Sequence, residues 1–332
     1  MVLIKTSHYV SLLVLLFVIA LFSAPLVWGQ NSPPVRLSLI PFLGEAPAYI
    51  AVQNRYFKDE GLDVTVIYNS AGKIALQKLF EDKVDIVTVA DTPIVYKAFN
   101  RDDFYILAGM THTDQQSGAI ARKDQGINTP AGIKGRRVAW FQGTGTDYLL
   151  DQYLLSNGLT LSDIETVDLK PKAMVKELIS GNVDAIFSWQ PHIMDAVNAL
   201  GDKAYILPTK GLKVLDWVVV TRKEFAEKNP KKLEKYLSAI IKANQFILEN
   251  PDEAMTIYAK ATGADIKIVS AMWEQFSYGL FLNESMLINM EDQARWIVRN
   301  KFQEKKKVPN YLSIFHVKPL MKVKPEAVTL IK

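Results

Sequence analysis

Apolar and polar positions along the chain follow two periodicities, one typical of strands and one typical of amphipathic helices. Val35 to Ile40 alternates as a strand does, Ala48 to Phe57 has helical spacing, and Leu62 to Tyr68 predicts a second strand. This order predicts a βαβ unit of the kind that builds parallel sheets. A helix near Lys73 to Asp82 then leads into Val84 to Ala90, a continuous apolar run typical of a strand buried on both faces.

A similar sequence returns 99 residues further along the chain. "LFEDKVDIV" at Leu79 to Val87 and "LISGNVDAI" at Leu178 to Ile186 share Leu, Val and Asp in register. This spacing is too long for a solenoid repeat. It fits two α/β lobes with the same βα order, the second starting near "INTPAGIKGRRVAWFQGTGT", in which Val138 to Phe141 predicts a strand. A chance similarity of two helix-to-strand turns is the alternative.

The pattern becomes mainly helical after "WVVVTR", Trp217 to Arg222, which is the last predicted strand. Asn229 as cap and Pro230 at the first helical position predict the start of a long helix. Asn250-Pro251 ends that helix and starts another. Two further helices are predicted near Ile266 to Leu280 and Glu284 to Phe302.

The first thirty residues have the layout of a secretory signal peptide. Lys5 precedes an apolar run from Tyr9 to Phe22, which small and helix-breaking residues follow. The run is shorter than the roughly twenty residues that span a bilayer, although Pro25 to Trp28 could extend it into an uncleaved anchor. We expect a signal peptide at residues 1–29, cleaved after Gly29, and therefore an exported, periplasmic protein.

Composition narrows the classes of function. A chain of 332 residues with 49% apolar and 22% charged residues suggests roughly two domains. Its formal charge of +4 is small, so nucleic acid is not an expected partner. The absence of cysteine excludes disulfides, thiolate metal sites, a cysteine nucleophile and a lipoprotein anchor. Four histidines at positions 8, 112, 192 and 316 never have zinc-ligand spacing, and there is no G-x-S-x-G motif, so we expect no metal, cofactor or catalytic group.

The stretch "FQGTGTDYLL" contains a glycine-rich turn between a predicted strand and a predicted helix. Tyr148 stands where a dinucleotide fingerprint needs its third glycine, and no lysine follows the glycines as in a Walker loop. The turn instead predicts an anion site, because glycines let backbone approach a ligand and the first helical turn offers free amides. The candidate residues are Gly143, Thr144, Gly145, Thr146 and Asp147. Capping of the helix by Thr146 or Asp147 is the alternative reading.

Other turns follow predicted strands, where open α/β sheets bind ligands. After the buried strand, Asp91 or Thr92 is a natural cap, with Pro93 in the first turn. Trp189 could stack on a planar ligand or pack in the core. The remaining candidates in these turns are Phe42, Gly44, Glu45, Tyr49, Ser70, Lys73 and Gln190.

The segment "APAYIAVQNRYFKDEGLDV", Ala46 to Val64, resembles the first helix and turn of the nitrate, sulfonate and taurine type of ABC-transporter substrate-binding protein, a group that includes thiamine-precursor binders. Further similarities are Val84-Asp85-Ile86, Val183-Asp184-Ala185, "IKGRRVAW" with the glycine turn, and "NPDEAM" at Asn250 to Met255. They occur in the family's order along nearly the whole mature chain.

The resemblance implies an α/β, two-lobed periplasmic-binding-protein fold of type II, each lobe a mixed sheet flanked by helices, with a helical C-terminal part. It implies lobe 1 at residues 31–116 and 215–332, and lobe 2 at 117–214. Ligand would be trapped between lobes that close by hinge motion and are read by a membrane permease. The turns at 41–45, 70–73, 91–93, 143–147 and 189–191 would face the cleft. Many relatives have Trp-Glu-Pro where this chain has Trp189-Gln190-Pro191, which makes a cationic or aminopyrimidine ligand less expected.

These observations predict a monomeric carrier of an ABC importer, without catalysis, for a small organic anion such as a sulfonate, taurine or nitrate, or for a flat heterocycle. A sensory or scaffold module held by an uncut N-terminal helix is the alternative from another class. An enzyme similar to the thiamine-pyrimidine synthases of the same superfamily is a third reading, which the absence of the cysteine-rich segment of those enzymes disfavours.

Overall fold

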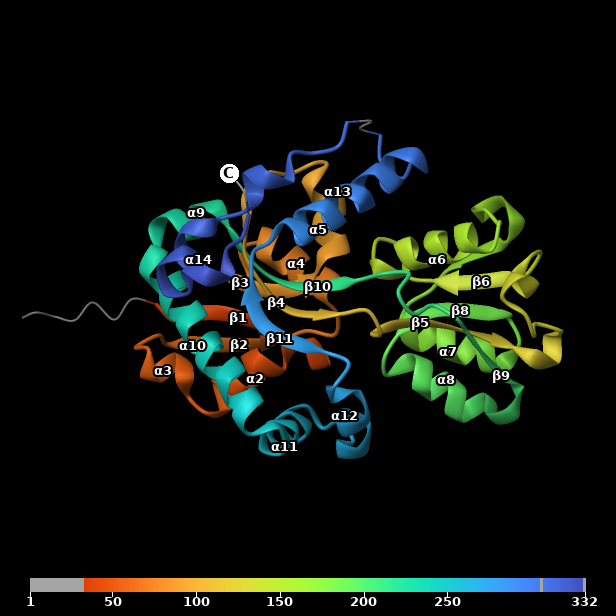
Figure 1. Cartoon of the computed structure of the whole chain (residues 1–332), viewed down its shortest axis with the longest axis horizontal. Coiled ribbons are helices and arrows are strands. Elements are labelled where there is room, and N and C mark those ends of the chain that lie inside the picture. The colour runs from red at the N-terminus through yellow and green to blue at the C-terminus, as the bar shows by residue number, and fades with distance from the viewer. Residues whose placement is uncertain (1–32, 305–306, 331–332) are drawn as a thin grey trace, which may run out of the picture. The chain divides into compact units, whose positions relative to one another are not determined.

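A computed structural model describes residues 33–304 and 307–330, and the predicted signal peptide at 1–29 lies outside them. The chain from Pro34 onward forms one compact unit. Its described strands form two mixed sheets, flanked by helices (Figure 1), which confirms the predicted fold class.

The first sheet has six strands in the order β11-β4-β10-β3-β1-β2. Strand β1 lies parallel to β2 and β3, whereas β10 is antiparallel to both β3 and β4, and β11 is antiparallel to β4. The strands are β1 (Val35–Leu39), β2 (Val64–Tyr68), β3 (Ile86–Ala90), β4 (Phe104–Thr113), β10 (Leu215–Arg222) and β11 (Ser277–Phe281).

The second sheet has five strands in the order β7-β6-β8-β5-β9 and repeats this pattern. Strand β6 lies parallel to β7 and β8, as β1 does to β2 and β3, and β5 is antiparallel to β8 and β9. The strands are β5 (Ser117–Arg122), β6 (Arg137–Trp140), β7 (Glu165–Asp168), β8 (Ala185–Trp189) and β9 (Ala204–Leu207). The chain passes between the sheets at residues 114–116 and 208–214, which lie next to the predicted lobe boundaries. Independent movement of the two parts stays a prediction.

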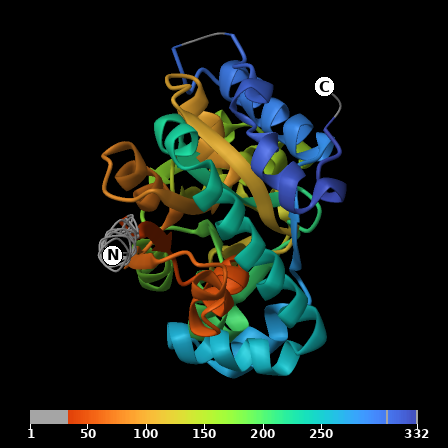
Figure 2. The same cartoon turned by 90° about the vertical axis from the view of Figure 1, so that its left-hand side faces the viewer.

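Helices cover both sheets. The α-helices are α2 (Ala46–Gln53), α3 (Tyr56–Asp59), α4 (Gly72–Phe80), α5 (Asp91–Ala98), α6 (Gly145–Ser156), α7 (Pro171–Ser180), α8 (His192–Leu200), α9 (Lys223–Lys228), α10 (Pro230–Glu249), α11 (Pro251–Thr262), α12 (Ile266–Trp273), α13 (Glu284–Arg299) and α14 (Val317–Val323). Short 3-10 helices are Leu43–Glu45, Lys123–Gln125, Pro130–Ile133, Leu161–Asp163, Gly201–Lys203, Tyr311–Ile314 and Pro325–Ala327. Figure 2 shows the long helix α10 from the side, with α11 and α12 below it. Helix α10 contacts α2, α3, α11 and α14, so the C-terminal helices close the core of the first sheet.

The repeated Val-Asp motif has the same role in both sheets. The Asp85 carboxylate accepts hydrogen bonds from the backbone amide and the guanidinium of Arg36, at 2.8 and 2.6 Å. Asp184 accepts the equivalent bonds from Arg137, at 2.9 and 3.0 Å. Burial alone would raise the pKa of both carboxyl groups, but the arginine contacts hold each pKa below its usual value. The repeat therefore ties the start of β3 to β1 and the start of β8 to β6, so the two motifs are structurally equivalent.

Two helix predictions were wrong in part. Residues 277–281 form strand β11 instead of the end of a helix, because β4 offers a sheet edge and the Phe281 ring packs where Gly109 has no side chain. A Cβ on Gly109 would lie 2.4 Å from the Phe281 ring. The helix predicted over Ala48 to Phe57 is divided into α2 and α3 at Arg55, whose φ is 62°. Strand pairing at residues 277–281 and a local turn at Arg55 thus outweigh the helical spacing of apolar residues in these segments.

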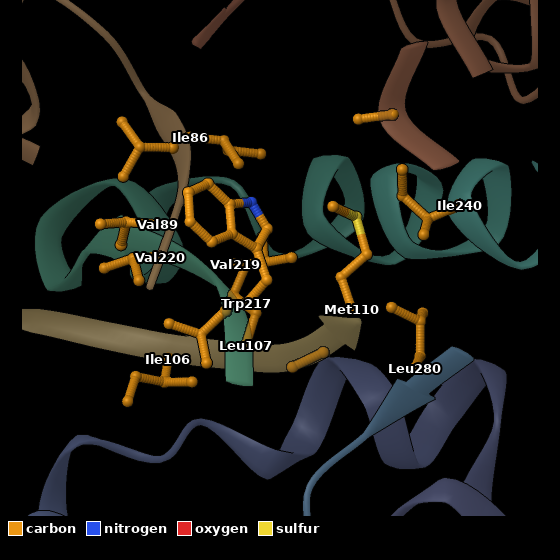
Figure 3. Packing of buried hydrophobic residues seen from close by; sticks show 14 of the residues in the cluster. Ile86, Val89, Ile106, Leu107, Met110, Trp217, Val219, Val220, Ile240 and Leu280 are labelled. Atoms are coloured by element: carbon orange, nitrogen blue, oxygen red, sulfur yellow. The ribbon is translucent and has the colours of Figure 1, made fainter. Parts of the chain in front are cut away.

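The buried apolar residues form one cluster around the first sheet and two around the second. Figure 3 shows Trp217 of β10 within the first cluster, together with the labelled aliphatic side chains of β3, β4 and β10. Only 6% of Trp217 is exposed. Trp217, one of the large side chains of this core, therefore lies near the start of β10, just after the chain has crossed between the sheets for the second time.

Candidate functional site

A cavity of about 420 Å3 lies between turns that belong to both sheets. Most of these turns follow the carboxyl ends of the parallel strands β1, β2, β3, β6, β7 and β8, while Gln116-Ser117 and Leu215 precede or start the antiparallel strands β5 and β10. Helix α11 completes the wall with Tyr258 and Thr262. The volume falls in the range of about 300 to 1,000 Å3 that is usual for pockets of small organic ligands.

The structure brings eight of the fifteen predicted site residues to this cavity. They are Phe42, Ser70, Lys73, Thr144, Gly145, Thr146, Trp189 and Gln190. The other seven do not line it, and all of them except the half-buried Gly143 are buried: Gly44, Glu45, Tyr49, Asp91, Thr92, Gly143 and Asp147. Sequence reasoning missed several lining residues, among them Gln116, Lys172, His192, Trp217 and Tyr258. Lys172 follows a parallel strand and could have been found by position, whereas Tyr258 sits within a helix and carries no such signal.

The glycine turn, Gly143 to Thr146, forms the start of helix α6. Thr144 is the N-cap, and its hydroxyl oxygen accepts a hydrogen bond from the Thr146 amide at 3.4 Å. The predicted alternative caps, Thr146 and Asp147, are therefore wrong. In the part of the chain that the structure describes, the amides of Thr144 and Gly145 have no hydrogen-bond acceptor. They can donate to an anion, as the first amides of a helix commonly do.

Two lysines approach the glycine turn because its glycines have no side chains. A Cβ on Gly143, whose φ is 75°, would lie 3.1 Å from Lys73 Nζ. A Cβ on Gly145 would lie 2.8 Å from Lys213 Cε. Lys73 Nζ also donates to the Gln142 carbonyl at 2.9 Å and lies 4.8 Å from the centre of the Phe141 ring. The turn thus has positive charge on the side of the first sheet.

Asp147 links the two sheets and does not line the cavity. Its Oδ2 accepts the Gly143 amide at 2.6 Å and the Tyr96 hydroxyl of α5 at 2.8 Å. Burial raises the pKa of Asp147 to about 6, although these hydrogen bonds oppose the rise. Its place in this structure is a tie between α5 and α6.

Asp91 is the centre of a buried polar network. It is the first residue of α5, and Ala90 is the N-cap, so the predicted capping by Asp91 or Thr92 is wrong. Lys213 Nζ lies 3.2 Å from Asp91 Oδ1, and the amide groups of Asn289 and Gln293 donate to Oδ2 at 2.8 and 2.6 Å. Burial raises the pKa of Asp91, and the Lys213 cation opposes that rise. The network holds α5 and α13 against the segment that re-enters the first sheet.

Glu45 and Tyr49 also lie inside the first part of the fold. Glu45 is completely buried and accepts a hydrogen bond from the Thr88 hydroxyl. Burial raises the pKa of Glu45 to about 8. The Tyr49 ring packs edge-on against Tyr258, 5.5 Å between centroids. Glu45 is therefore mostly uncharged at neutral pH and adds little negative charge behind the cavity.

Gly44 acts on the cavity through Phe42. A Cβ on Gly44 would lie 2.3 Å from the Phe42 ring, which lines the cavity. Gly44→Ala is expected to push this ring from its place and to destabilise the fold by about 1 to 3 kcal/mol, the usual cost of overpacking. Chemical denaturation measures this change. Gly279→Ala is the control, since no atom lies within 4 Å of the added carbon; equal stabilities for the two variants would contradict the prediction.

The second sheet provides the opposite wall with Trp189 and Gln190. Gln190 Oε1 accepts the Met194 amide at 3.2 Å, so this side chain caps α8 from the cavity edge. The half-buried Trp189 ring lies 6.2 Å from the ring of His192. Burial lowers the pKa of His192, which leaves this imidazole neutral at pH 7.

The charged groups in the cavity wall are all basic. Lys73 and Lys172 line it, and among the described residues that line it there is no aspartate or glutamate. Residues 33–304 and 307–330 contain no group of three or more acidic or histidine side chains able to hold a metal ion. Over the same residues, no helix combines the length and hydropathy needed to cross a membrane. The arrangement favours a ligand that is negatively charged at one point and apolar elsewhere.

The chain belongs to the NMT1/THI5-like family, whose profile matches residues 44–254. The taurine-binding periplasmic protein of Escherichia coli (strain K12) is 27% identical over 214 residues, which cover 62% of this chain and 64% of that protein. The periplasmic aliphatic sulphonate binding protein SsuA of Escherichia coli has a similar structure, with a TM-score of 0.72, 19% identity, and coverage of 85% of this chain and 92% of that one.

The alkanesulfonate-binding protein SsuA from Xanthomonas axonopodis pv. citri, solved with bound MOPS, has a TM-score of 0.75 at 17% identity, over 87% of this chain and 99% of that chain. These similarities confirm the periplasmic-binding-protein fold. The named relatives are binding proteins, in agreement with the prediction that this chain is not an enzyme.

Proposed function

We propose that this protein is the extracytoplasmic solute-binding component of an ABC importer and captures a small organic anion between two lobes for delivery to a permease. The cavity carries this proposal, because basic side chains and free helix amides line it and its described lining residues include no carboxylate. Free amides at the start of a helix stabilise an anion, and the lining lysines Lys73 and Lys172 add to this effect.

The anion would bind at the glycine turn of α6. The amides of Thr144 and Gly145 would donate to it, with Lys73 on the side of the first sheet. A sulfonate fits this set of donors, since its oxygens only accept hydrogen bonds. Sulfonate- and taurine-binding relatives support this class of ligand. The lobes would close around the ligand through the crossings at residues 114–116 and 208–214.

A thermal-shift screen of the purified protein tests the proposal. Alkanesulfonates, taurine, nitrate, pyrimidine precursors of thiamine and riboflavin form a panel that separates anions from flat heterocycles. We expect stabilisation by sulfonates, because ligand binding to the folded state raises the unfolding temperature. A panel in which only the neutral heterocycles stabilise the protein would overturn the anionic ligand.

Trp189→Ala is expected to weaken ligand binding by roughly 1 to 3 kcal/mol, the usual effect of removing an aromatic anchor. The half-buried ring faces the cavity at the carboxyl end of β8, so most of the loss should appear in affinity. Isothermal titration with a sulfonate found in the screen measures it, with the unfolding temperature as control. A lower unfolding temperature with unchanged affinity would instead make Trp189 a packing residue.

A membrane-held sensory module is the alternative from another class, and it depends on residues 1–29 staying attached. Mass spectrometry of the mature N-terminus distinguishes the two. An intact Met1 in the membrane fraction would contradict a carrier that diffuses in the periplasm.

A further inference from the structure

We propose that the ligand is an aromatic anion without an ammonium group, such as an arylsulfonate, with its ring held between aromatic side chains of both sheets. This inference rests on the proposed function and narrows its ligand. Five aromatic residues carry it, and they line the cavity together with the two lysines: Phe42, Phe141, Trp189, Trp217 and Tyr258.

The aromatic wall of the first sheet is built before any ligand arrives. The Phe42 and Trp217 rings pack 4.1 Å apart between centroids, at an interplanar angle of 44°. Phe276 packs edge-on against Phe42 at 5.8 Å, and the missing side chain of Gly44 leaves room for the Phe42 ring. Rings that are fixed in this way lose little conformational entropy when they bind a flat ligand.

The second sheet provides aromatic rings on its own side of the cavity. Phe141 follows β6 next to the glycine turn, and Lys73 Nζ lies 4.8 Å from its ring centre. Trp189 ends β8 beside His192. Both rings are only half-buried, which leaves apolar surface free for a ligand. Because Phe141 is next to the predicted anion site, an anion there would bring its attached apolar group toward these rings.

The aromatic lining and the charge of the cavity argue against the smaller anions. Nitrate or a short alkyl sulfonate is too small to contact most of the five aromatic side chains that line the cavity. Taurine also carries an ammonium group, which needs an acceptor of negative charge when buried. The described lining has no carboxylate, and Glu45, behind Phe42, is held mostly neutral by its burial. An aromatic anion fills the wall and brings no cation.

Isothermal titration of the purified full chain with 2-naphthalenesulfonate, benzenesulfonate, ethanesulfonate, taurine and the neutral benzenesulfonamide tests the inference. We expect benzenesulfonate to bind at least about tenfold more tightly than ethanesulfonate, since the ring buries several additional carbons. We expect 2-naphthalenesulfonate to bind at least as tightly as benzenesulfonate, and taurine to bind more weakly than ethanesulfonate.

The outcomes separate this inference from the proposed function. Ethanesulfonate or taurine binding as tightly as benzenesulfonate would overturn the aromatic ligand and leave the anion carrier standing. Benzenesulfonamide binding as tightly as benzenesulfonate would overturn the anionic ligand in both proposals. Absence of binding by every sulfonate would overturn the proposed function and this inference with it.

Two variants, one from each sheet, locate the ring. Phe141→Leu and Trp217→Leu are each expected to lower the ratio of benzenesulfonate to ethanesulfonate affinity roughly three- to tenfold. A ratio of two affinities is used because a partly unfolded sample lowers both affinities alike. If the variant of the buried Trp217 does not fold, the variant of the half-buried Phe141 still provides the test. Tyr105→Leu is the matched control, because Tyr105 stacks on His316 away from the cavity. Unchanged ratios in both variants would overturn the placement of the ring.

Discussion

Thr144→Asp is expected to lower the affinity for a sulfonate at least about tenfold without unfolding the protein. Thr144 is the N-cap of α6, and aspartate caps helices as well as threonine does. The new carboxylate would lie beside the amides of Thr144 and Gly145, where we expect the anion. Like charges about 4 Å apart repel by ~1 to 4 kcal/mol, depending on the exposure of the site.

Thr144→Asn is the matched control for this prediction. Asparagine has nearly the same shape as aspartate and is an equally good N-cap, but it has no charge. Titrations with ethanesulfonate and benzenesulfonate, together with unfolding temperatures, compare the two variants. If Thr144→Asp binds sulfonates as tightly as Thr144→Asn does, the anion does not bind at the glycine turn.

Lys213→Met is expected to destabilise the protein by about 3 to 5 kcal/mol, the effect of breaking a buried ion pair. Both side chains are inaccessible, at 1% exposure for Lys213 and 0% for Asp91. The variant leaves Asp91 as an unpaired carboxylate among the amide groups of Asn289 and Gln293. Urea denaturation at pH 7 measures the free energy of unfolding.

The pH dependence of this loss has a definite sign. Burial already raises the pKa of Asp91, and removal of the lysine raises it further. The folded variant therefore keeps the Asp91 proton at pH values where the folded wild-type protein has released it, so the deficit shrinks as the pH falls from the Asp91 pKa of the variant toward that of the wild-type protein. Lys228→Met is the control, since the Lys228 pair with Glu224 is exposed and should contribute little. A deficit that does not change with pH would show that the variant fails for another reason.

Residue patterns predicted the position of the anion site but not the role of each of its residues. The glycine turn was predicted because strand, glycines and helix follow one another, and these are local properties of the chain. Its cap was predicted wrongly, since Thr144, Thr146 and Asp147 are all acceptable caps and only the path of the backbone selects one. Asp91 was predicted to face the ligand, but it faces Lys213 from a segment 122 residues away.

The sequence predicted only some of the aromatic residues that line the cavity. Phe42 and Trp189 follow predicted strands, so position alone made them candidates. Trp217 is the third residue of the antiparallel strand β10, and the sequence gives no sign of which edge of the sheet this end of the strand reaches. Tyr258 comes from α11 and reaches the cavity by helix packing alone. Strand β11 was missed for a related reason, since its pairing with β4 depends on Gly109, far away in sequence.

The sequence by itself determined the α/β class of both halves, the order of most elements, the repeated Val-Asp motif and the absence of cysteine chemistry. These follow from local periodicity and composition, which do not depend on distant contacts, whereas the two-lobed binding-protein fold was implied by the family resemblance. Only the tertiary structure decided which turns meet at one cavity, which polar residues are used up in buried contacts, and that the cavity wall is basic and aromatic. Those properties depend on the side chains of two sheets that are brought together in space, and no local pattern encodes that pairing.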